Sequence, residues 1–119
     1  MIYGIGTDLI EVERIKKAYD KESFRKKVFT QQEQTMIAEN AQRAAGNFAV
    51  KESVVKAFGT GFGKISAIDI EVLRETSGKP YVVLHGSAKE LAETEHILQV
   101  HVSISNTREY ATSYVVMEV

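Results

Sequence analysis

The second half of the chain alternates apolar and polar residues with a period of two, which is typical of half-buried β-strands. The segments with this pattern are 67–73, 81–84, 100–105 and 110–119. We expect the first two to pair as a hairpin, because the turn-forming sequence Thr-Ser-Gly-Lys-Pro separates them. In the third, Val100, Val102 and Ile104 share one face, so the opposite face is polar. A polar stretch at 87–95 predicts a short helix between the strands.

The first half starts with a short buried strand, predicted over residues 2–7, and Asp8 is predicted to start a helix directly after it. Asp8 and Glu11 have the spacing of a capping box, in which two side chains satisfy free backbone groups at a helix start. The apolar residues that follow at roughly helical spacing are Leu9, Val12, Ile15 and Tyr19.

Two more helices are predicted before the strands begin. Thr30 and Glu33 form a second capping box, for a short helix that ends near Asn40. A longer helix covers about 41–58, and Gly59 is a natural stop because glycine readily adopts the left-handed backbone at a helix end. Its apolar surface comes from Phe48, Val54, Val55 and Phe58. Helices packed on an antiparallel sheet give an α+β fold, which we expect to be one domain over 1–119.

Composition narrows the function classes. A net charge of −1, from 15 Lys and Arg against 16 Asp and Glu, argues against a nucleic-acid partner. The absence of Cys excludes disulfides, thiolate zinc sites and cysteine nucleophiles. No apolar run approaches the ~20 residues of a membrane span, and the N-terminus lacks the layout of a signal peptide. We therefore expect a cytoplasmic protein that contacts no membrane.

The first candidate site is on the first strand, where Gly4, Gly6 and Asp8 share one face. Two glycines weaken a strand, so we expect something to approach it closely there. Asp8 is then either a carboxylate in an open niche that suits Mg²⁺, or a capping residue beside tightly packed backbone. These residues alone favour the second interpretation.

The second candidate is the pair Glu52 and Lys56, which share a face of the long helix. In isolation such a pair is more often an exposed ion pair that contributes little stability. Phe48 and Val55 flank Glu52, however, so the pair borders an apolar stripe. A carboxylate for a metal ion, with a lysine one turn away for a phosphate, is the functional alternative.

Two further segments could contact phosphate. The glycine-rich stretch 59–64 does not match a phosphate-binding loop, and it follows a helix, so the negative end of the helix dipole faces it. Any anion held there needs lysines. The polar residues of 101–107 could bind phosphate oxygens or could form a solvated sheet face.

Basic residues gather between positions 14 and 27, where only Asp20 and Glu22 oppose them and Phe24 and Val28 add apolar contacts. The basic residues are Arg14, Lys16, Lys17, Lys21, Arg25, Lys26 and Lys27. The segment is either a solvated helix or a docking surface for an acidic partner.

In their order along the chain, these motifs resemble the bacterial holo-acyl-carrier-protein synthases, the short type of 4′-phosphopantetheinyl transferase. The resemblance runs nearly end to end. Its motifs are Gly-Ile-Gly-Thr-Asp at 4–8, Phe-Ala-Val-Lys-Glu-Ser at 48–53 with Lys56, Gly-Thr-Gly at 59–61, Gly-Lys-Pro at 78–80, and His-Val-Ser-Ile-Ser at 101–105 before Tyr110 and Ala111.

The resemblance implies that the protein moves 4′-phosphopantetheine from coenzyme A to a serine of apo-acyl carrier protein, in fatty acid biosynthesis. The by-product is adenosine 3′,5′-bisphosphate. It also implies a homotrimer with active sites between subunits, each with the phosphopantetheinyl transferase fold. Asp8 and Glu52 correspond to Mg²⁺ ligands and Lys56 to a pyrophosphate contact.

The resemblance also assigns the substrate surfaces. The walls of the coenzyme A site correspond to Gly59, Thr60, Gly61, Ser105, Asn106 and Thr107. The acidic carrier would dock on Arg14, Lys21, Phe24 and Arg25.

Two positions depart from the family pattern. Many relatives have His where this chain has Asn106, and Arg where it has Asn47. A missing His leaves the general base open between Glu52 and a metal-bound water, and a missing Arg weakens anion binding unless another basic residue compensates. These departures favour the alternative of a non-catalytic module of the same fold that binds coenzyme A or an acidic partner. A structural trimer, with Glu52 and Lys56 as a mere surface pair, is the other alternative.

Overall fold

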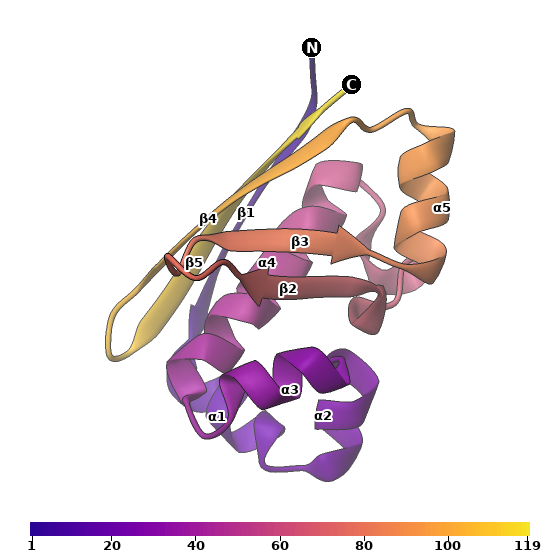
Figure 1. Ribbon diagram of the computed structural model, residues 1–119. Helices are drawn as coiled ribbons and strands as arrows, with labels where there is room; N and C mark the ends of the chain where they lie inside the picture. The colour runs from indigo at the N-terminus through magenta and orange to yellow at the C-terminus, as the bar shows by residue number, and fades with distance from the viewer.

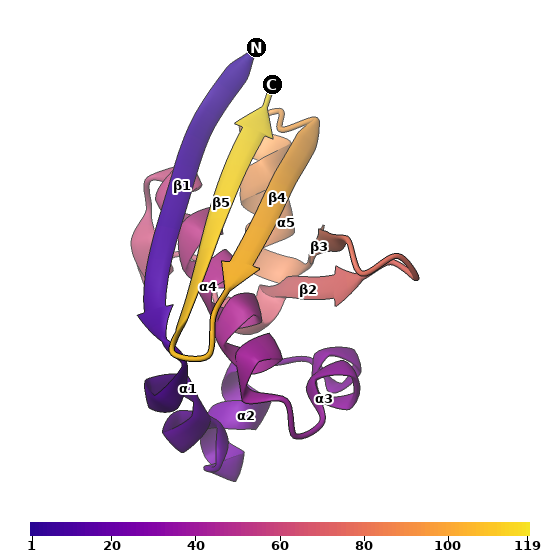
Figure 2. The same ribbon diagram turned by 90° about the vertical axis from the view of Figure 1, so that its left-hand side faces the viewer.

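The computed structural model describes residues 1–119, and its largest element is a three-stranded antiparallel sheet (Figure 1). The strand order is β1-β5-β4, so the first strand pairs with the last. The strands are β1 (Ile2–Glu11), β4 (Gln99–Asn106) and β5 (Tyr110–Glu118). The long helix α4 (Ala41–Phe58) packs on one face, and Figure 2 shows that no helix covers the other.

The remaining elements complete an α+β fold around α4, as predicted. Helices α1, α2 and α3 gather at one end of the molecule, and the β2–β3 hairpin with α5 lies beside α4 (Figure 1). Their bounds are α1 (Val12–Tyr19), α2 (Glu22–Val28), α3 (Gln31–Ile37), β2 (Ile70–Arg74), β3 (Pro80–Leu84) and α5 (Gly86–Thr94). None of the helices combines the length and apolar character that crossing a bilayer requires.

The elements with a strong sequence pattern are where we expected them. Helix α4 has the predicted bounds, and Gly59 ends it with a left-handed φ of 80°. The predicted hairpin is confirmed, although Ala67–Asp69 form a 3₁₀ turn and the strand begins only at Ile70. In β4, Val100, Val102 and Ile104 face the interior and the residues between them face solvent.

The predicted helix start at Asp8 is wrong. Strand β1 continues through Asp8 to Glu11, and helix α1 begins at Val12 without a side-chain cap. The reason is long-range pairing: β5 provides backbone partners for β1 as far as the pair Glu11 and Tyr110. The spacing of Asp8 and Glu11 therefore forms no capping box, and Asp8 is a strand residue.

The second predicted capping box is confirmed. The Glu33 N–H donates to Thr30 Oγ1 and the Thr30 N–H donates to Glu33 Oε1, each at 3.1 Å. Helix α3 ends at Ile37, short of the predicted end, because Ala38 adopts a φ of 48°. Asn40 instead caps the start of α4, where its side chain accepts a hydrogen bond from the Arg43 N–H at 3.1 Å.

The predicted close approach to the first strand is made by α4 itself. A Cβ placed on Gly6 would lie 1.9 Å from the Ser53 carbonyl oxygen, and one on Gly4 would lie 2.2 Å from that of Ala57. Both contacts are shorter than real Cβ contacts, so only glycine lets β1 pack directly on the helix backbone. Next to this contact the hydroxyls of Ser53 and Ser113 share a buried hydrogen bond of 2.5 Å.

A buried ion pair fixes the opposite side of α4. Lys51 Nζ lies 2.8 Å from Glu33 Oε1 with both side chains fully buried, and it also donates to the carbonyls of Ala67 and Ile70. Burial lowers the pKa of Lys51 and raises the pKa of Glu33, while their mutual attraction opposes both shifts. The pair ties α3 and β2 to the helix that carries Glu52.

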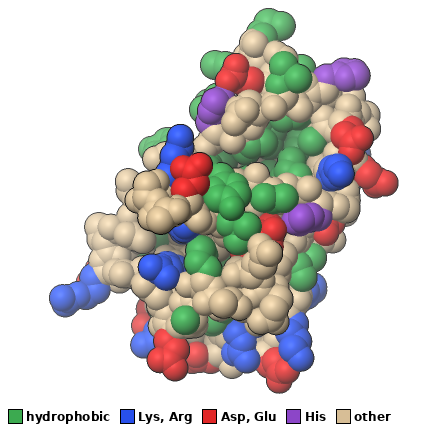
Figure 3. Space-filling view, in the orientation of Figure 1, with side chains coloured by type: hydrophobic (Ala, Val, Ile, Leu, Met, Phe, Trp, Pro, Cys, Tyr) green, Lys and Arg blue, Asp and Glu red, His purple; other side chains and the backbone are tan.

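The surface of the molecule has an apolar hollow between β3, α5 and the start of β4, visible in Figure 3. It has a volume of about 430 Å³, and its lining includes Tyr81, Leu84, Ala92 and Leu98. The hollow exists because β3 and β4 lie side by side but belong to different sheets. It shares no residue with the groove described next.

Candidate functional site

A groove of about 310 Å³ brings the predicted carboxylates together with part of the predicted docking surface. Its polar lining is Asp8, Glu52 and Arg14, from β1, α4 and α1. Its apolar lining includes Phe24 and Phe48, whose ring centroids are 6.0 Å apart. Residues far apart in the sequence therefore form one cleft with an acidic part and an aromatic part.

The contact between β1 and α4 places Asp8 beside Glu52 and Lys56. Asp8 lies on the glycine face of β1, which packs on the α4 backbone at Ser53. Lys56 Nζ is 3.4 Å from Asp8 Oδ1 and donates to the Thr7 carbonyl at 2.9 Å. Lys56 is half-exposed, whereas Asp8 is largely buried. The structure thus brings together all three predicted catalytic residues.

Negative charge is concentrated between Asp8 and Glu52. Burial raises the pKa of Glu52, and the nearby charge of Asp8 raises it further, while Lys56 and Arg14 act in the opposite direction. No third acidic, histidine or cysteine side chain joins them in a cluster. Two carboxylates fit a hard divalent cation such as Mg²⁺, which fills its other positions with water and phosphate oxygens.

The loop after α4 continues from Lys56. Gly59 and Gly61 both have positive φ, of 80° and 66°, so the chain turns sharply there. Thr60 Oγ1 donates to the Gly61 carbonyl at 3.0 Å, and the N–H groups of Gly59 and Thr60 donate to the Val55 carbonyl at 2.9 and 3.2 Å, so these groups are already paired within the chain. Lys56 and Lys64 are the cations next to the loop, and they could offset the negative end of the helix dipole.

The second predicted segment of the coenzyme A site lies on the other face of the sheet. Ser105 pairs with Thr112, which pairs with Leu9, and all three point away from α4. Together with Asn106 and Thr107 they line a shallow hollow of about 260 Å³ on the uncovered face. Within one chain, therefore, 105–107 do not meet Asp8, Glu52 and Lys56.

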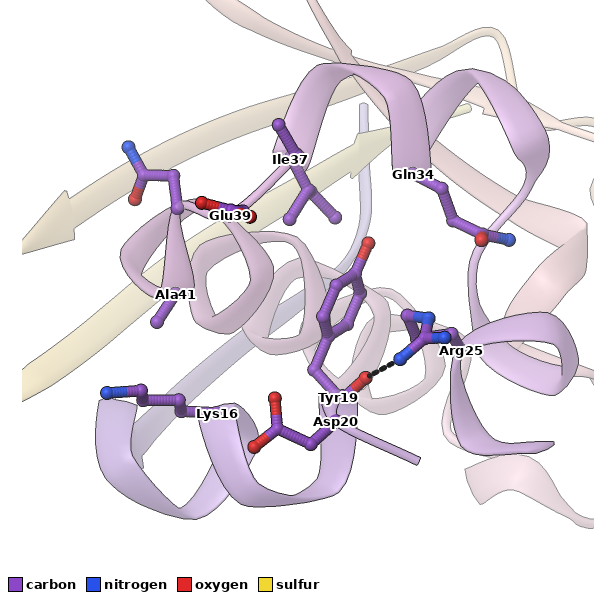
Figure 4. A pocket seen from close by; sticks show the side chains of 10 residues that line it. Lys16, Tyr19, Asp20, Arg25, Gln34, Ile37, Glu39 and Ala41 are labelled. Carbon is purple, nitrogen blue, oxygen red and sulfur yellow. Dashed lines mark hydrogen bonds between the residues drawn. The ribbon is translucent and has the colours of Figure 1, made fainter. Parts of the chain in front are cut away.

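The predicted docking residues also separate. Arg14 and Phe24 line the groove with the carboxylates, but Arg25 turns away from it. Arg25 Nη1 donates to the Tyr19 carbonyl at 2.7 Å, and its guanidinium carbon lies 5.7 Å from the centre of the Tyr19 ring. Figure 4 shows both side chains in a hollow of about 480 Å³ between α1, α2 and α3. Lys21 precedes α2 and is exposed.

The two departures from the family pattern have different environments. Asn47 is fully buried, and its Nδ2 donates to Glu33 Oε2 at 3.1 Å and to the Val72 carbonyl at 3.0 Å. It is part of the polar cluster around Lys51 and has no surface to offer a ligand. Asn106 is exposed at the end of β4, where its amide can give only a neutral hydrogen bond.

Comparison with known proteins gives consistent matches over the whole chain. A family model described as the 4′-phosphopantetheinyl transferase superfamily matches residues 4–115. The holo-[acyl-carrier-protein] synthase of Lachnoclostridium phytofermentans is 50% identical over 119 residues, which cover 100% of this chain and 98% of that protein.

Solved structures agree with this match. The crystal structure of the holo-[acyl-carrier-protein] synthase from Neisseria meningitidis has a TM-score of 0.90 at 30% identity, covering 100% of both chains. The Bacillus anthracis holo-(acyl-carrier-protein) synthase, in complex with CoA (3′,5′-ADP), has a TM-score of 0.81 at 36% identity, covering 98% of this chain and 96% of that one.

Proposed function

Because the chain belongs to the 4′-phosphopantetheinyl transferase superfamily, we propose that it is a holo-[acyl-carrier-protein] synthase. It would transfer 4′-phosphopantetheine from coenzyme A to a serine of apo-acyl carrier protein, and release adenosine 3′,5′-bisphosphate. The observation that supports this proposal is that Asp8 and Glu52 line one groove and that Lys56 contacts Asp8 beside it. The product would serve fatty acid biosynthesis.

The chain's own residues can perform the steps that this reaction needs. The carrier serine oxygen attacks the β-phosphorus, a new O–P bond forms, and the bond to the leaving phosphate breaks. Lys56, half-exposed beside Asp8, can donate hydrogen bonds to the pyrophosphate as negative charge builds on the leaving group. We place the serine proton on the Glu52 carboxylate, which lines the groove and has no ion-pair partner there.

We further propose that the enzyme depends on Mg²⁺, held by Asp8 and Glu52. When bound, the ion would neutralise charge on the pyrophosphate of coenzyme A. The fit rests on the donor set: two neighbouring carboxylates without nitrogen or sulfur ligands suit a hard cation. Lys56 Nζ, now 3.4 Å from Asp8 Oδ1, would turn from that carboxylate towards the phosphate.

The direct test is incubation of the protein with apo-acyl carrier protein, coenzyme A and Mg²⁺, followed by intact mass spectrometry of the carrier. We expect the carrier to gain one phosphopantetheine group. A carrier of unchanged mass, under conditions where a known transferase modifies it, would reject the enzyme in favour of a non-catalytic binding module. Of the two departures from the family pattern, only Asn106 is exposed and able to contact a ligand, because Asn47 is buried. Asn106 is therefore the residue that favours the non-catalytic alternative.

The acidic carrier protein is proposed to dock at the groove through Arg14 and Phe24. We expect Arg14→Glu to raise the KM for the carrier about tenfold, because the change places like charge against an acidic partner. The KM for coenzyme A should change much less. Steady-state kinetics with each substrate varied in turn measures both values.

Arg25→Glu is the matched control for this prediction. Its guanidinium is tied to the Tyr19 carbonyl and faces the separate hollow in Figure 4, so its effect on carrier binding should be smaller. Equal effects of the two reversals would mean that the carrier covers both hollows. Equal losses for both substrates in Arg14→Glu would contradict a separate docking surface.

We also propose that the protein is a homotrimer in which segment 105–107 of one subunit completes the coenzyme A site of another. Two observations support this arrangement: these residues face away from Asp8 in their own chain, and apolar side chains are exposed around them. Ile5, Leu9 and Tyr114 are 69%, 68% and 61% exposed on that face. Isolated soluble subunits rarely leave such a patch uncovered.

The charged variant Tyr114→Glu should therefore dissociate the trimer. We expect light scattering coupled to size-exclusion chromatography to report a lower mass at micromolar concentration. Leu98→Glu is the control, because Leu98 is 80% exposed in the apolar hollow away from this face. A wild-type protein that is monomeric at all concentrations would refute the shared site.

A further inference from the structure

Lys56 is the one basic side chain that forms an ion pair with a carboxylate of the groove. Its Nζ lies 3.4 Å from Asp8 Oδ1 and donates to the Thr7 carbonyl at 2.9 Å, so both of its partners belong to β1. The other ion pairs of the chain include neither Asp8 nor Glu52. An amine of the protein therefore already contacts one of the two carboxylates that the groove offers to a cation.

This amine partly offsets the repulsion between the two carboxylates. Burial, and then the nearby charge of Asp8, raise the pKa of Glu52, whereas the charges of Lys56 and Arg14 lower it. Arg14 lines the groove but forms no ion pair, so Lys56 is the cation in direct contact. A divalent cation that approaches the carboxylates therefore meets a positive charge beside Asp8, and like charges at such a distance repel each other.

Lys56 is free to leave Asp8, in contrast to the other lysine of the same motif. Its side chain is 52% exposed, and Asp8 and Thr7 are its hydrogen-bond partners. Lys51 is completely buried and donates to Glu33 and to two backbone carbonyls, which fixes its position. An exposed ion pair like that of Lys56 contributes little free energy, so a competing ligand can separate it at a small cost.

We propose that Lys56 is the internal counter-ion of Asp8 in the ligand-free protein, and that it exchanges with Mg²⁺ when coenzyme A binds. The inference rests on the proposed function, in which Asp8 and Glu52 hold the ion and the pyrophosphate lies beside Lys56. The lysine opposes metal binding to the ligand-free site. This opposition is removed once the pyrophosphate gives the amine a new partner.

Such an exchange makes the binding of the metal ion and of coenzyme A interdependent. Coenzyme A draws Lys56 away from Asp8, so the ion binds more tightly to the protein that already holds coenzyme A. Binding free energies are reciprocal, so the ion raises the affinity for coenzyme A by the same factor. Direct attraction between the ion and the pyrophosphate adds to the coupling, but only the share of the lysine depends on residue 56. The site would thus take up a divalent cation mainly together with its substrate.

The test measures the affinity for Mn²⁺, a paramagnetic substitute for Mg²⁺, with and without coenzyme A. Electron paramagnetic resonance reports the free ion, and a titration of coenzyme A alone corrects for the ion that it binds in solution. Without coenzyme A, we expect Lys56→Met to bind Mn²⁺ about fivefold more tightly than wild type, because one positive charge about 4 Å from a carboxylate is removed. The gain in Mn²⁺ affinity that coenzyme A produces should fall by about the same factor. Lys56→Arg keeps the charge and should stay close to wild type.

Two further variants separate the charge of Lys56 from its other contacts. Lys56→Gln removes the charge but keeps a donor for the Thr7 carbonyl, and it should bind Mn²⁺ as tightly as Lys56→Met. Lys89→Met, which removes an exposed charge from α5, is the control and should leave both Mn²⁺ affinities unchanged. The proposal is overturned if neither neutral variant binds Mn²⁺ more tightly than wild type, or if coenzyme A raises their Mn²⁺ affinity as much as it does in wild type. Tighter binding in Lys56→Met but not in Lys56→Gln would assign the effect to the hydrogen bond with Thr7 and would also contradict it.

These results are separate from a failure of the proposed function, because they need no carrier protein. A wild-type protein that shows the coupling through Lys56 but leaves the carrier unmodified would reject the transferase activity and keep the exchange. A protein that modifies the carrier, but whose Mn²⁺ affinity does not depend on Lys56, would keep the activity and reject the exchange. Absence of Mn²⁺ binding both with and without coenzyme A would reject the metal site, and the exchange with it.

Discussion

Asp8→Asn and Glu52→Gln are each expected to lower kcat/KM for phosphopantetheine transfer about a hundredfold or more. Either change removes one of the two carboxylates that the groove offers to a cation. The cation, which would neutralise the negative charge that builds on the leaving phosphate, would then be held less tightly. The measurement is the rate of carrier modification at increasing Mg²⁺ concentration. Calorimetry with coenzyme A, with and without Mg²⁺, adds a binding readout that does not depend on turnover.

The two amides keep the size of the side chains, so the fold should survive. Thermal melting verifies this, and Glu13→Gln is the matched control because Glu13 is an exposed carboxylate of α1 that does not line the groove. We expect the control to keep wild-type activity and wild-type dependence on Mg²⁺. If both groove variants also kept wild-type activity and Mg²⁺ dependence, the alternative of a structural trimer, with Glu52 and Lys56 as a mere surface pair, would be favoured.

Local patterns in the sequence predict most of the secondary structure because they are decided within a few residues. Gly59 ends the helix at 41–58 as expected, and Asn40, which we expected at the end of the preceding helix, caps its start. The error at Asp8 has a different origin. Leu9 and Val12 allow either a helix or a strand, and the choice is made by β5, which is about a hundred residues away in the sequence. No local signal reports such a pairing.

The candidate site was only partly predictable for the same reason. The spacing of Glu52 and Lys56 places them on one helix face, and the glycine face of β1 carries Asp8, but only the packing of β1 on α4 unites them. The alternation of β4 correctly puts Ser105 on its polar face. That this face is opposite to Asp8 follows from the strand register, which the sequence alone does not reveal.

Charged residues inside the fold were the least predictable feature. Lys51 lies in the same motif as Glu52 and Lys56, yet its side chain is completely buried against Glu33. Arg74 ends a strand that reads as an ordinary amphipathic segment, and its unpaired nitrogen appears only once α4 and β4 are in place. Burial of this kind depends on three elements that meet in space, so no spacing rule finds it.

Gly6→Ala is expected to lower the free energy of unfolding by about 3 kcal/mol or more. The new Cβ would lie 1.9 Å from the Ser53 carbonyl oxygen and 2.8 Å from its carbonyl carbon, and both are backbone atoms that cannot rotate away. Strand β1 must therefore move off α4, and because β1 is paired with β5, this movement strains the hydroxyl pair of Ser53 on α4 and Ser113 on β5. The same movement separates Asp8 from Glu52 and Lys56. Urea denaturation measures the stability, and transfer assays well below the melting temperature measure the activity of the folded fraction.

The other glycines of the chain provide a graded control for this prediction. Gly63→Ala should change stability by no more than a few tenths of a kcal/mol, because nothing lies within 4 Å of its Cβ position. Gly4→Ala should be intermediate, since its closest contact is 2.2 Å and it lies near the free start of β1, where the strand can bend. If the loss of stability does not decrease in the order Gly6→Ala, Gly4→Ala, Gly63→Ala, strand propensity and not the contact with α4 would be the cause. The predicted order instead makes the contact between β1 and α4 the feature that both stabilises the fold and assembles the site.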